Sequence, residues 1–349
     1  MRTSDFDYHL PPELIAQSPA EPRDSSRLLV LDRRADSVRH WVFRDLPEFL
    51  HPGDLLVANR SRVIPARLMG RKEATGSAVE MLLLRPAAGS ETPAEWDVLL
   101  KPARRLRQGS RLLFGEGNEL AATVLGSNEL GVRRVLLESA EPLDRVIDRV
   151  GRAPLPPYIK GYTGDPERYQ TVYGDVRGSA AAPTAGLHFT PDLMQRIQDR
   201  GASFAFVLLH IGIDTFRPIQ EEDPTQHPMH REYYEVPEAA ALEIRRAKAE
   251  GRRVIAVGTT TVRVLETAAR NSGTEGGPAA GAGWSELFIY PGFTFKVVDA
   301  LITNFHLPRS TLMMLVSALA GRERLLSAYR EAMEEGYRFY SFGDGMLLL

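Results

Sequence analysis

Histidine, threonine and serine side chains gather in three segments of the chain, and their types suit proton transfer and anion binding. The segments are AAPTAGLHFT (181–190), VGTTTVR (257–263) and TNFHLPRST (303–311). Each leads into a predicted helix, and the last two also follow predicted strands. Polar residues just past the carboxyl ends of strands are where α/β proteins bind ligands. We therefore expect the three segments to form one site at the edge of a sheet.

Three histidines are the candidate proton-transfer residues. Imidazole titrates near neutral pH and can act as acid or base. His188 ends the run of small residues in the first segment, His306 lies in the third, and His210 follows the buried run 206–209. A histidine in such a place is about as often a structural residue, so the residue type alone leaves both roles open.

The second segment predicts an anion site at the start of a helix. The strand 254–257 passes through Gly258 into Thr259–Thr261, where free N–H groups, the helix dipole and hydroxyl donors attract an anion. Arg263, one turn further on, is placed to clamp a carboxylate or phosphate. The alternative is an ordinary strand-to-helix turn with threonine caps, which the spacing alone favours.

The third segment predicts a second helix start, capped by Ser310 and preceded by Asn304. Both helix starts share one sheet edge if their strands are parallel. In the first segment, Thr184 and Gly186 belong to a run of small residues that lets backbone approach a ligand closely. The convergence of these groups is more specific than any one of them.

Several chemistries are excluded or disfavoured. The chain has no cysteine, so disulfides, thiolate zinc sites, iron–sulfur clusters and a cysteine nucleophile are ruled out. It has no GxGxxG after a strand, no P-loop and no GxSxG elbow. His227 and His230 lack the flanking acid and third ligand of a zinc site, so we expect surface histidines and no bound metal.

Charge is unevenly distributed along the chain. The net charge is −2, yet the stretch from Arg60 to Lys160 holds 17 lysines and arginines against 12 acids, and the remainder 26 against 33. Such a basic stretch suits a phosphate-binding face, although a solvated surface would look the same. The first residues lack the pattern of a signal peptide, and the longest apolar run (312–320) is too short to span a membrane. We therefore expect a cytoplasmic protein.

The elements that must position these residues show two kinds of secondary-structure pattern. Six short β-like runs separated by turn residues (63–71, 78–85, 95–102, 110–115, 120–126 and 131–139) predict a small antiparallel barrel or sandwich, followed by a helix at 142–151. After 160, helices and strands alternate, which predicts an α/β layer structure with a parallel or mixed sheet. The strands include 286–290 and 299–305, and residues 271–283 are expected to be a mobile loop. We predict a large α/β domain (1–61 and 151–349) with a barrel domain (62–150) inserted in it.

The whole chain resembles the S-adenosylmethionine:tRNA ribosyltransferase-isomerases of queuosine biosynthesis. The likeness rests on long, irregular strings besides the three segments: DFDYHLPPELIAQSPAEPRDSSRLLVL (5–31), GDLLVANRSRVIPARLMG (53–70), PLPPYI (154–159), VIAVGTTTVRVLE (254–266), FIYPGFTFKVVDALITNFHLPRSTLMMLVSALAG (288–321) and YRFYSFGDGMLL (337–348). One departure is HIGIDTF (210–216), where Asp214 replaces the family's glycine. The resemblance also implies a barrel inserted in an α/β domain.

The resemblance implies an unusual pentosyl transfer. The ribosyl part of S-adenosylmethionine moves to the aminomethyl group of 7-aminomethyl-7-deazaguanine at the tRNA wobble position and isomerises, giving epoxyqueuosine, adenine and methionine. S-adenosylmethionine is then a co-substrate, with no permanently bound cofactor and no metal. The RNA partner is the anticodon stem-loop of a tRNA with a GUN anticodon, and we expect no membrane association and a monomer.

Residue types can be matched to this reaction. The sulfonium acidifies the adjacent carbon, so a base can begin the sequence, and His188, His210 and His306 are the candidates, with Asp299 and Asp344 as weaker candidates that steer the sulfonium. Phe293 and Phe305 are further candidates to stack on a base, although Phe305 better suits the core. The expected substrate-binding residues are Thr184, Gly186, Thr259, Thr260, Thr261, Arg263, Tyr290, Asn304 and Ser310. The expected contacts to the anticodon stem are Arg104, Arg105 and Arg107.

Two other functions remain open from the residues alone. A metal-dependent hydrolase would use the histidines as ligands and would hold stoichiometric metal. A non-catalytic RNA-binding protein would bind tRNA regardless of S-adenosylmethionine and would release no adenine.

Overall fold

The computed structural model describes residues 1–349 except 88–91, 93, 128–130, 213–218, 230 and 274–275. The chain divides into two compact units. The large unit comprises Met1–Arg62, Pro156–Val176 and Ala182–Leu349, and the barrel unit comprises Val63–Leu155 and Arg177–Ala181. The predicted domain boundaries at residues 62 and 150 remain predictions. In the described part of the chain, no helix has the length and apolar character needed to cross a membrane.

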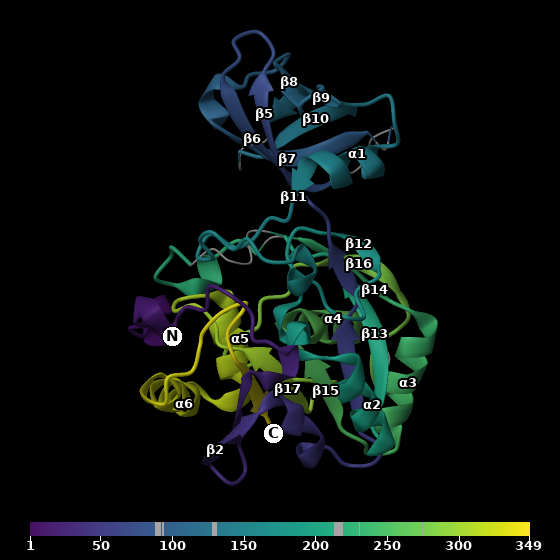
Figure 1. The fold of residues 1–349 in the computed structure, drawn as a ribbon. Helices are drawn as coiled ribbons and strands as arrows, with labels where there is room; N and C mark the ends of the chain where they lie inside the picture. Colours follow the sequence, from purple (N-terminus) through teal and green to yellow (C-terminus); the bar gives the residue numbers. More distant parts are fainter. Residues whose placement is uncertain (88–91, 93, 128–130, 213–218, 230, 274–275) are drawn as a thin grey trace. The chain divides into compact units, whose positions relative to one another are not determined.

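The large unit is built on a nine-stranded mixed sheet (Figure 1). Its strands, in spatial order, are β16 (Gly281–Ser285), β14 (Glu232–Val236), β13 (Ser203–Leu209), β3 (Leu55–Asn59), β15 (Val254–Val257), β17 (Ala300–Asn304), β18 (Gly345–Leu348), β1 (Arg27–Asp32) and β2 (Ser37–Val42). β13, β3, β15 and β17 run parallel, whereas β18 runs antiparallel to β17. The predicted α/β fold with a mixed sheet is confirmed.

The parallel register of β15 and β17 brings their carboxyl ends to one edge, with Val257 opposite Ile302. α4 (Thr259–Asn271) follows β15 after a single glycine, and α5 (Thr311–Ala320) follows β17 after a short loop. Both helices therefore begin at the same edge of the sheet, as expected for parallel strands.

Helices and 3-10 turns cover the sheet on both faces. α3 (Glu238–Ala249) and α4 pack against β13 and β15, and α5 packs against α4 and α6 (Arg322–Glu334). Alternate residues of β3, β15 and β17, among them Leu56, Ile255 and Ile302, enter an apolar core formed with α2 (Pro191–Asp199) and the 3-10 helix Phe43–Phe49. This period of two is the pattern of a sheet buried on both faces.

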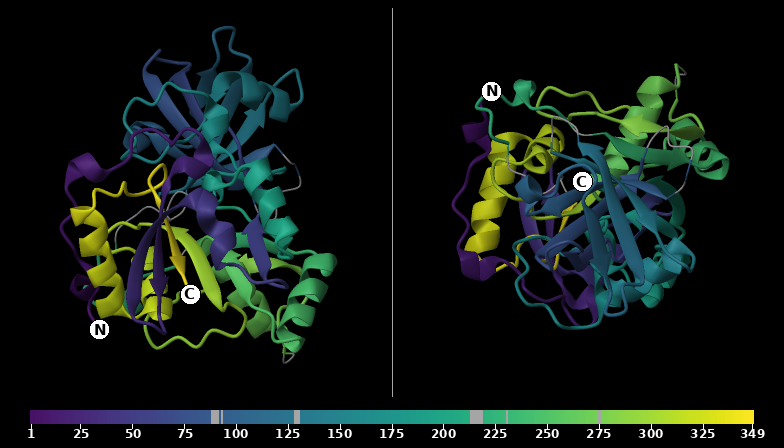
Figure 2. Two further views of the ribbon diagram at one scale, coloured as in Figure 1. Left: turned by 60° about the horizontal axis from the view of Figure 1, so that its bottom comes forward. Right: turned by 90° about the horizontal axis from the view of Figure 1, so that it is seen from above.

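The N-terminal segment lies along the C-terminal part of the same unit. Figure 2 shows the purple N-terminal chain beside the yellow helix α6 in both views. Tyr8 packs edge-to-face on Tyr329 of α6, with ring centroids 5.3 Å apart, and the Ala16 N–H donates to the Phe339 carbonyl at 3.2 Å. Residues more than 300 positions apart in sequence thus share one core.

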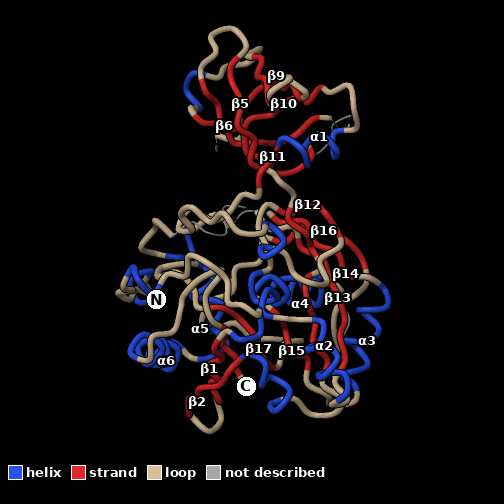
Figure 3. The backbone as a smooth tube through the Cα atoms, viewed as in Figure 1, coloured by secondary structure: helices blue, strands red, loops and turns tan. Residues whose placement is uncertain are grey.

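The barrel unit is a closed antiparallel sheet of six strands with a short helix (Figure 3). The strands are β5 (Arg67–Lys72), β6 (Ala78–Pro86), β7 (Glu95–Lys101), β8 (Arg111–Phe114), β9 (Leu120–Ser127) and β10 (Arg133–Glu138), joined at one end by β11 (Gly151–Arg152), and the helix is α1 (Leu143–Val150). Pairing of β5 with β8 closes the barrel. At this closure a Cβ on Gly70 would meet the Leu113 carbonyl oxygen at 2.3 Å, so a larger residue would separate the strands. The predicted antiparallel barrel is confirmed.

One predicted strand is wrong. Residues 286–290 are not a strand, and the strand is instead β16, whose first residues fall within the predicted loop 271–283. The sequence GAGWS has little intrinsic preference for strand, but its backbone pairs with β14 along five residues, from Gly281 opposite Val236 to Ser285 opposite Glu232. Pairing with an existing edge therefore outweighs local propensity. β4 (Ser61–Val63) and β12 (Val176–Ser179) form a separate two-stranded sheet.

Candidate active site

A cavity opens in the large unit at the carboxyl ends of β15 and β17, and it is partly open to solvent. Residues from all three predicted segments line it: Thr184 from the first, Gly258–Thr260 from the second, and Thr303–Leu307 with Ser310 from the third. The structure therefore brings the three segments together in one site.

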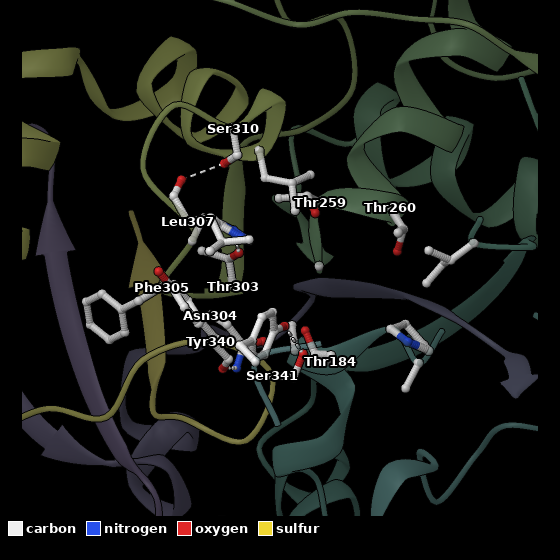
Figure 4. A pocket seen from close by; sticks show the side chains of 18 residues that line it. Thr184, Thr259, Thr260, Thr303, Asn304, Phe305, Leu307, Ser310, Tyr340 and Ser341 are labelled. Atoms are coloured by element: carbon white, nitrogen blue, oxygen red, sulfur yellow. Dashed lines mark hydrogen bonds between the residues drawn. The ribbon is translucent and has the colours of Figure 1, made fainter. Parts of the chain in front are cut away.

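Two helix starts face this cavity (Figure 4). Gly258, at φ +89°, turns β15 into α4, and its N–H donates to the Ile302 carbonyl at 2.8 Å, which ties the start of α4 to β17. No side chain caps α4. Ser310 caps α5 by accepting from the Met313 N–H at 3.1 Å, and its hydroxyl donates to the Leu307 carbonyl at 2.7 Å. The start of α4 thus offers unused N–H donors to an anion.

His306 is the histidine that lines the cavity among the described residues. The ring Nε2 of His306 lies 2.7 Å from the Thr303 hydroxyl oxygen. The backbone N–H of His306 donates to the Tyr329 hydroxyl at 2.9 Å, and its backbone carbonyl accepts from the Tyr8 hydroxyl. Burial lowers the pKa of His306 to about 3, so the ring is neutral at physiological pH.

His188 is buried behind the cavity wall and is not among the described residues that line it. Its Nδ1 lies 2.8 Å from Ser26 Oγ, its Nε2 lies 3.1 Å from Asn304 Nδ2, and its ring stacks on Phe43 at 4.7 Å. Burial, aided by the positive charges of Arg338 and Arg23, lowers its pKa to about 3. His188 is therefore linked to the cavity by its hydrogen bond with Asn304, which lines it.

His210 is partly buried at the end of β13, beside the cavity residue Ile211. Its Nδ1 lies 2.9 Å from Ser61 Oγ, and its ring stacks on Tyr233 with centroids 6.0 Å apart. Burial lowers the pKa of His210. The three candidate histidines thus differ in position: His306 lies in the cavity wall, His188 behind it and His210 beside it.

Some of the predicted small and hydroxyl residues line the cavity, and others have a structural role. Thr259 and Thr260 line the cavity with Thr184. Thr261 turns inward, and its hydroxyl donates to the Val257 carbonyl at 2.7 Å. Gly186 serves packing, because a Cβ there would meet the Tyr173 hydroxyl oxygen at 2.1 Å.

Four of the predicted polar residues lie away from the cavity. Arg263 is buried and paired with Glu232. Asp299 precedes β17, at the end opposite Asn304, and accepts from Lys248 Nζ at 2.8 Å. Asp344 is buried and accepts from the backbone N–H groups of residues 27 and 338 at 3.0 and 2.8 Å.

Tyr290, the fourth, packs on Phe288 with ring centroids 5.3 Å apart. Two further aromatic candidates have structural partners of their own. The Phe305 ring is fully buried against Phe339 at 4.7 Å, and Figure 4 shows it pointing away from the other labelled side chains. The Phe293 ring lies under the guanidinium of Arg270 at 3.9 Å.

The three candidate RNA-binding arginines lie in the barrel unit. Arg104 and Arg105 belong to a 3-10 turn after β7, and Arg107 follows it. All three side chains are exposed, and within the described ranges none of them is ion-paired with a carboxylate. Most other arginines of this unit are paired, for example Arg111 with Glu138 at 2.6 Å.

Four cavity residues that carry hydroxyl groups were not among the predicted site residues: Tyr158, Thr303, Tyr340 and Ser341. The Tyr158 and Ser341 hydroxyl oxygens are 2.6 Å apart, and the Tyr158 and Tyr340 rings lie 4.8 Å apart. Tyr340 has φ +72°, a conformation that non-glycine residues seldom adopt. A sequence signal existed, since both tyrosines lie in strings shared with the resembled family.

Some predictions concern residues outside the described ranges. Asp214, with the rest of 213–218, and His230 are among them. Within the described part of the chain, no group of three histidine, aspartate or glutamate side chains is arranged to hold a metal ion.

Comparison with known proteins agrees with the resemblance seen in the sequence. Residues 3–348 match a family described as "Queuosine biosynthesis protein". The chain is 55% identical to the S-adenosylmethionine:tRNA ribosyltransferase-isomerases of Heliobacterium modesticaldum and of Moorella thermoacetica, over 100% of each chain. It is 41% identical to the S-adenosylmethionine tRNA ribosyltransferase of Thermotoga maritima, whose crystal structure matches 99% of this chain and 100% of its own with a TM-score of 0.56. The chain therefore belongs to the queuosine biosynthesis protein family and is an enzyme of its ribosyltransferase-isomerase class.

Proposed function

We propose that this enzyme transfers and isomerises the ribosyl moiety of S-adenosylmethionine onto the aminomethyl group of 7-aminomethyl-7-deazaguanine at the tRNA wobble position, yielding epoxyqueuosine, adenine and methionine. The observation that carries the proposal is the cavity at the ends of β15 and β17, which has two unlike sides (Figure 4). Thr259, Thr260 and Ser310 lie on one side, and Tyr340 and Ser341 on the other.

The two sides suit the two ends of S-adenosylmethionine. The positive end of α4 and the threonine hydroxyls favour the methionine carboxylate, because a helix start with free N–H groups stabilises an anion. The tyrosine side offers aromatic surface to the adenine ring. The sulfonium and ribose then lie between them, near His306.

His306 is the proposed proton-transfer residue. The neutral imidazole has a lone pair that can accept a proton, and its lowered pKa makes it a weaker base than a free imidazole. The wobble base lies in a single-stranded loop, so it can be splayed into the cavity at less cost than a base in a duplex.

The direct test is incubation with tRNA that carries 7-aminomethyl-7-deazaguanine in a GUN anticodon. We expect the mass of the wobble nucleoside to change to that of epoxyqueuosine, with one adenine released per modified tRNA. Adenine release without nucleoside change would contradict transfer. Binding of tRNA that is indifferent to S-adenosylmethionine, with no adenine, would instead support a binding protein. Activity that tracks stoichiometric metal in untagged protein would support the metal-dependent hydrolase.

Replacing His306 by alanine should lower the rate of adenine release by about 100-fold, the lower end of what general acid–base catalysis contributes. His210→Ala, which removes a ring beside the cavity, should have a smaller effect. Single-turnover assays with saturating tRNA measure both rates, and circular dichroism checks that each variant is folded. Wild-type rates in His188→Ala, His210→Ala and His306→Ala together would refute a histidine mechanism.

Replacing Arg104, Arg105 and Arg107 together by alanine should weaken tRNA binding by about 10- to 100-fold at low salt. The plot of log affinity against log salt should become shallower by about two to three, because each phosphate contact contributes roughly 0.9 to the slope. Arg111→Ala is the matched control, since its guanidinium is already paired with Glu138. Equal affinities and slopes for the triple variant and the wild type would show that these arginines do not contact RNA.

A further inference from the structure

The Asn304 side chain holds an acceptor that the rest of the protein leaves unused. Asn304 ends β17, lines the cavity and is only 2% exposed. Its Nδ2 lies 3.1 Å from His188 Nε2 and 3.3 Å from the Tyr340 carbonyl oxygen. Its Oδ1 is buried and has no hydrogen-bond partner in the described structure. An unmet buried acceptor at a ligand cavity calls for a donor from the ligand.

The surrounding groups allow one orientation of this amide. The Tyr340 carbonyl can only accept, so the amide must present Nδ2 to it. The second hydrogen of Nδ2 then points to His188 Nε2, which must be unprotonated. The His188 proton is therefore on Nδ1 and is donated to Ser26 Oγ, whose own hydroxyl donates to the Arg23 carbonyl at 3.2 Å. Within this series of hydrogen bonds, from the Arg23 carbonyl to the Asn304 amide, Asn304 Oδ1 is the atom that has no partner.

A protonated His188 would reverse the arrangement. Nε2–H would then face Nδ2–H, and the amide would have to flip, leaving the Tyr340 carbonyl without its donor. Burial of His188, with its low pKa, keeps the ring neutral and the amide in place. His188 thus acts on the cavity through the polarity of Asn304.

The place of Asn304 indicates which ligand group supplies the donor. Its partner Tyr340 belongs to the aromatic side of the cavity, opposite Thr259 and the start of α4 (Figure 4). A planar base that stacks on this side carries its exocyclic amine toward Asn304, whereas the methionine carboxylate is drawn to the helix start. We propose that Asn304 Oδ1 accepts a hydrogen bond from the exocyclic amine of the adenine ring, and that His188 is the positioning residue that holds the Asn304 amide in the accepting orientation.

The inference rests on the proposed function, and binding measurements separate the two. S-adenosylmethionine and S-inosylmethionine, in which the amine is replaced by a carbonyl oxygen, are titrated by calorimetry into the same full-length protein. We expect the wild type to prefer S-adenosylmethionine by about 10- to 100-fold, because two acceptors would otherwise face each other. Asn304→Leu should reduce this ratio to within about twofold of one.

The His188 variants test the positioning role. His188→Leu should lose the preference, whereas His188→Gln, whose carbonyl oxygen can still accept from Asn304 Nδ2, should keep most of it. Ser26→Ala leaves the ring in place but removes the acceptor of Nδ1–H, so it should lower the ratio by a smaller factor. A purely structural role for His188 would weaken both ligands equally and leave the ratio unchanged.

The outcomes are distinct. No binding of S-adenosylmethionine to the wild type, either alone or in the presence of tRNA, would refute the proposed function itself. Binding with a wild-type ratio near one, or an unchanged ratio in Asn304→Leu, would refute the adenine contact alone. An unchanged ratio in both His188→Leu and Ser26→Ala would refute the positioning role of His188 and leave the contact standing.

Discussion

Replacing Glu266 by alanine should lower the free energy of unfolding by about 3–5 kcal/mol, the usual cost of removing one partner from a buried charged network. Glu266 is fully buried in α4. Its carboxylate accepts from the N–H groups of Lys296, Val297 and Val298 at 2.9–3.2 Å, and from Arg270 Nη1 at 2.8 Å. The alanine variant leaves the N–H groups of Val297 and Val298 buried without an acceptor. Urea unfolding followed by fluorescence measures the loss.

The consequence extends to the active site, because residues 296–298 lead directly into β17, which carries Asn304. Glu250→Ala in the loop after α3 is the control: Glu250 is also a carboxylate with arginine partners, Arg246 and Arg252, but it is exposed to water. We expect that variant to unfold much like the wild type, since exposed ion pairs contribute little. A similar loss of unfolding free energy in the two variants would show that the Glu266 network does not stabilise the segment 296–298.

Lowering the pH from 7 to 5 should destabilise the protein by about 4 kcal/mol through His188 and His306 alone. In the folded protein burial lowers the pKa of each to about 3, against an ordinary value of 6.5. Above pH 6.5 both rings are neutral whether the chain is folded or not, so the full stability is present. Below pH 6.5 the unfolded chain takes up protons that the folded protein excludes, and stability falls by about 1.4 kcal/mol per pH unit for each ring until about pH 3.

Urea unfolding at half-unit steps between pH 7 and 5 measures this dependence. Replacing one of the two histidines by glutamine should remove about half of the slope, and the double variant nearly all of it apart from a contribution of the same sign from His210. A pH-independent wild type over this window, or an unchanged slope in the double variant, would show that folding does not lower the pKa of these two rings.

Much of the fold could be predicted from local patterns. Thr190 caps α2 by accepting from the Leu193 N–H at 3.1 Å, and Ser310 caps α5 in the same way, as their residue types indicate. The six runs of the barrel emerge as six strands because turn residues and short apolar runs act over a few positions. β16 could not be predicted, since Gly281–Ser285 becomes a strand only by pairing with β14.

The candidate site divides in the same way. Its place followed from the sequence, because strand ends and helix starts are local features and parallel strands bring them to one edge. The roles of its side chains did not follow, because each depends on a partner distant in sequence. Arg263 is paired with Glu232, and Asp299 with Lys248, so neither reaches the cavity.

The three segments that first suggested chemistry therefore carry two kinds of information. The sequence by itself determined that histidines and hydroxyl groups meet at two helix starts, because periodicity, caps and glycine turns are properties of neighbouring residues. Only the tertiary structure decided that His306 faces the cavity while His188 lies behind it. That difference arises from Ser26 and Asn304, which lie 162 and 116 positions from His188 and take both of its ring nitrogens.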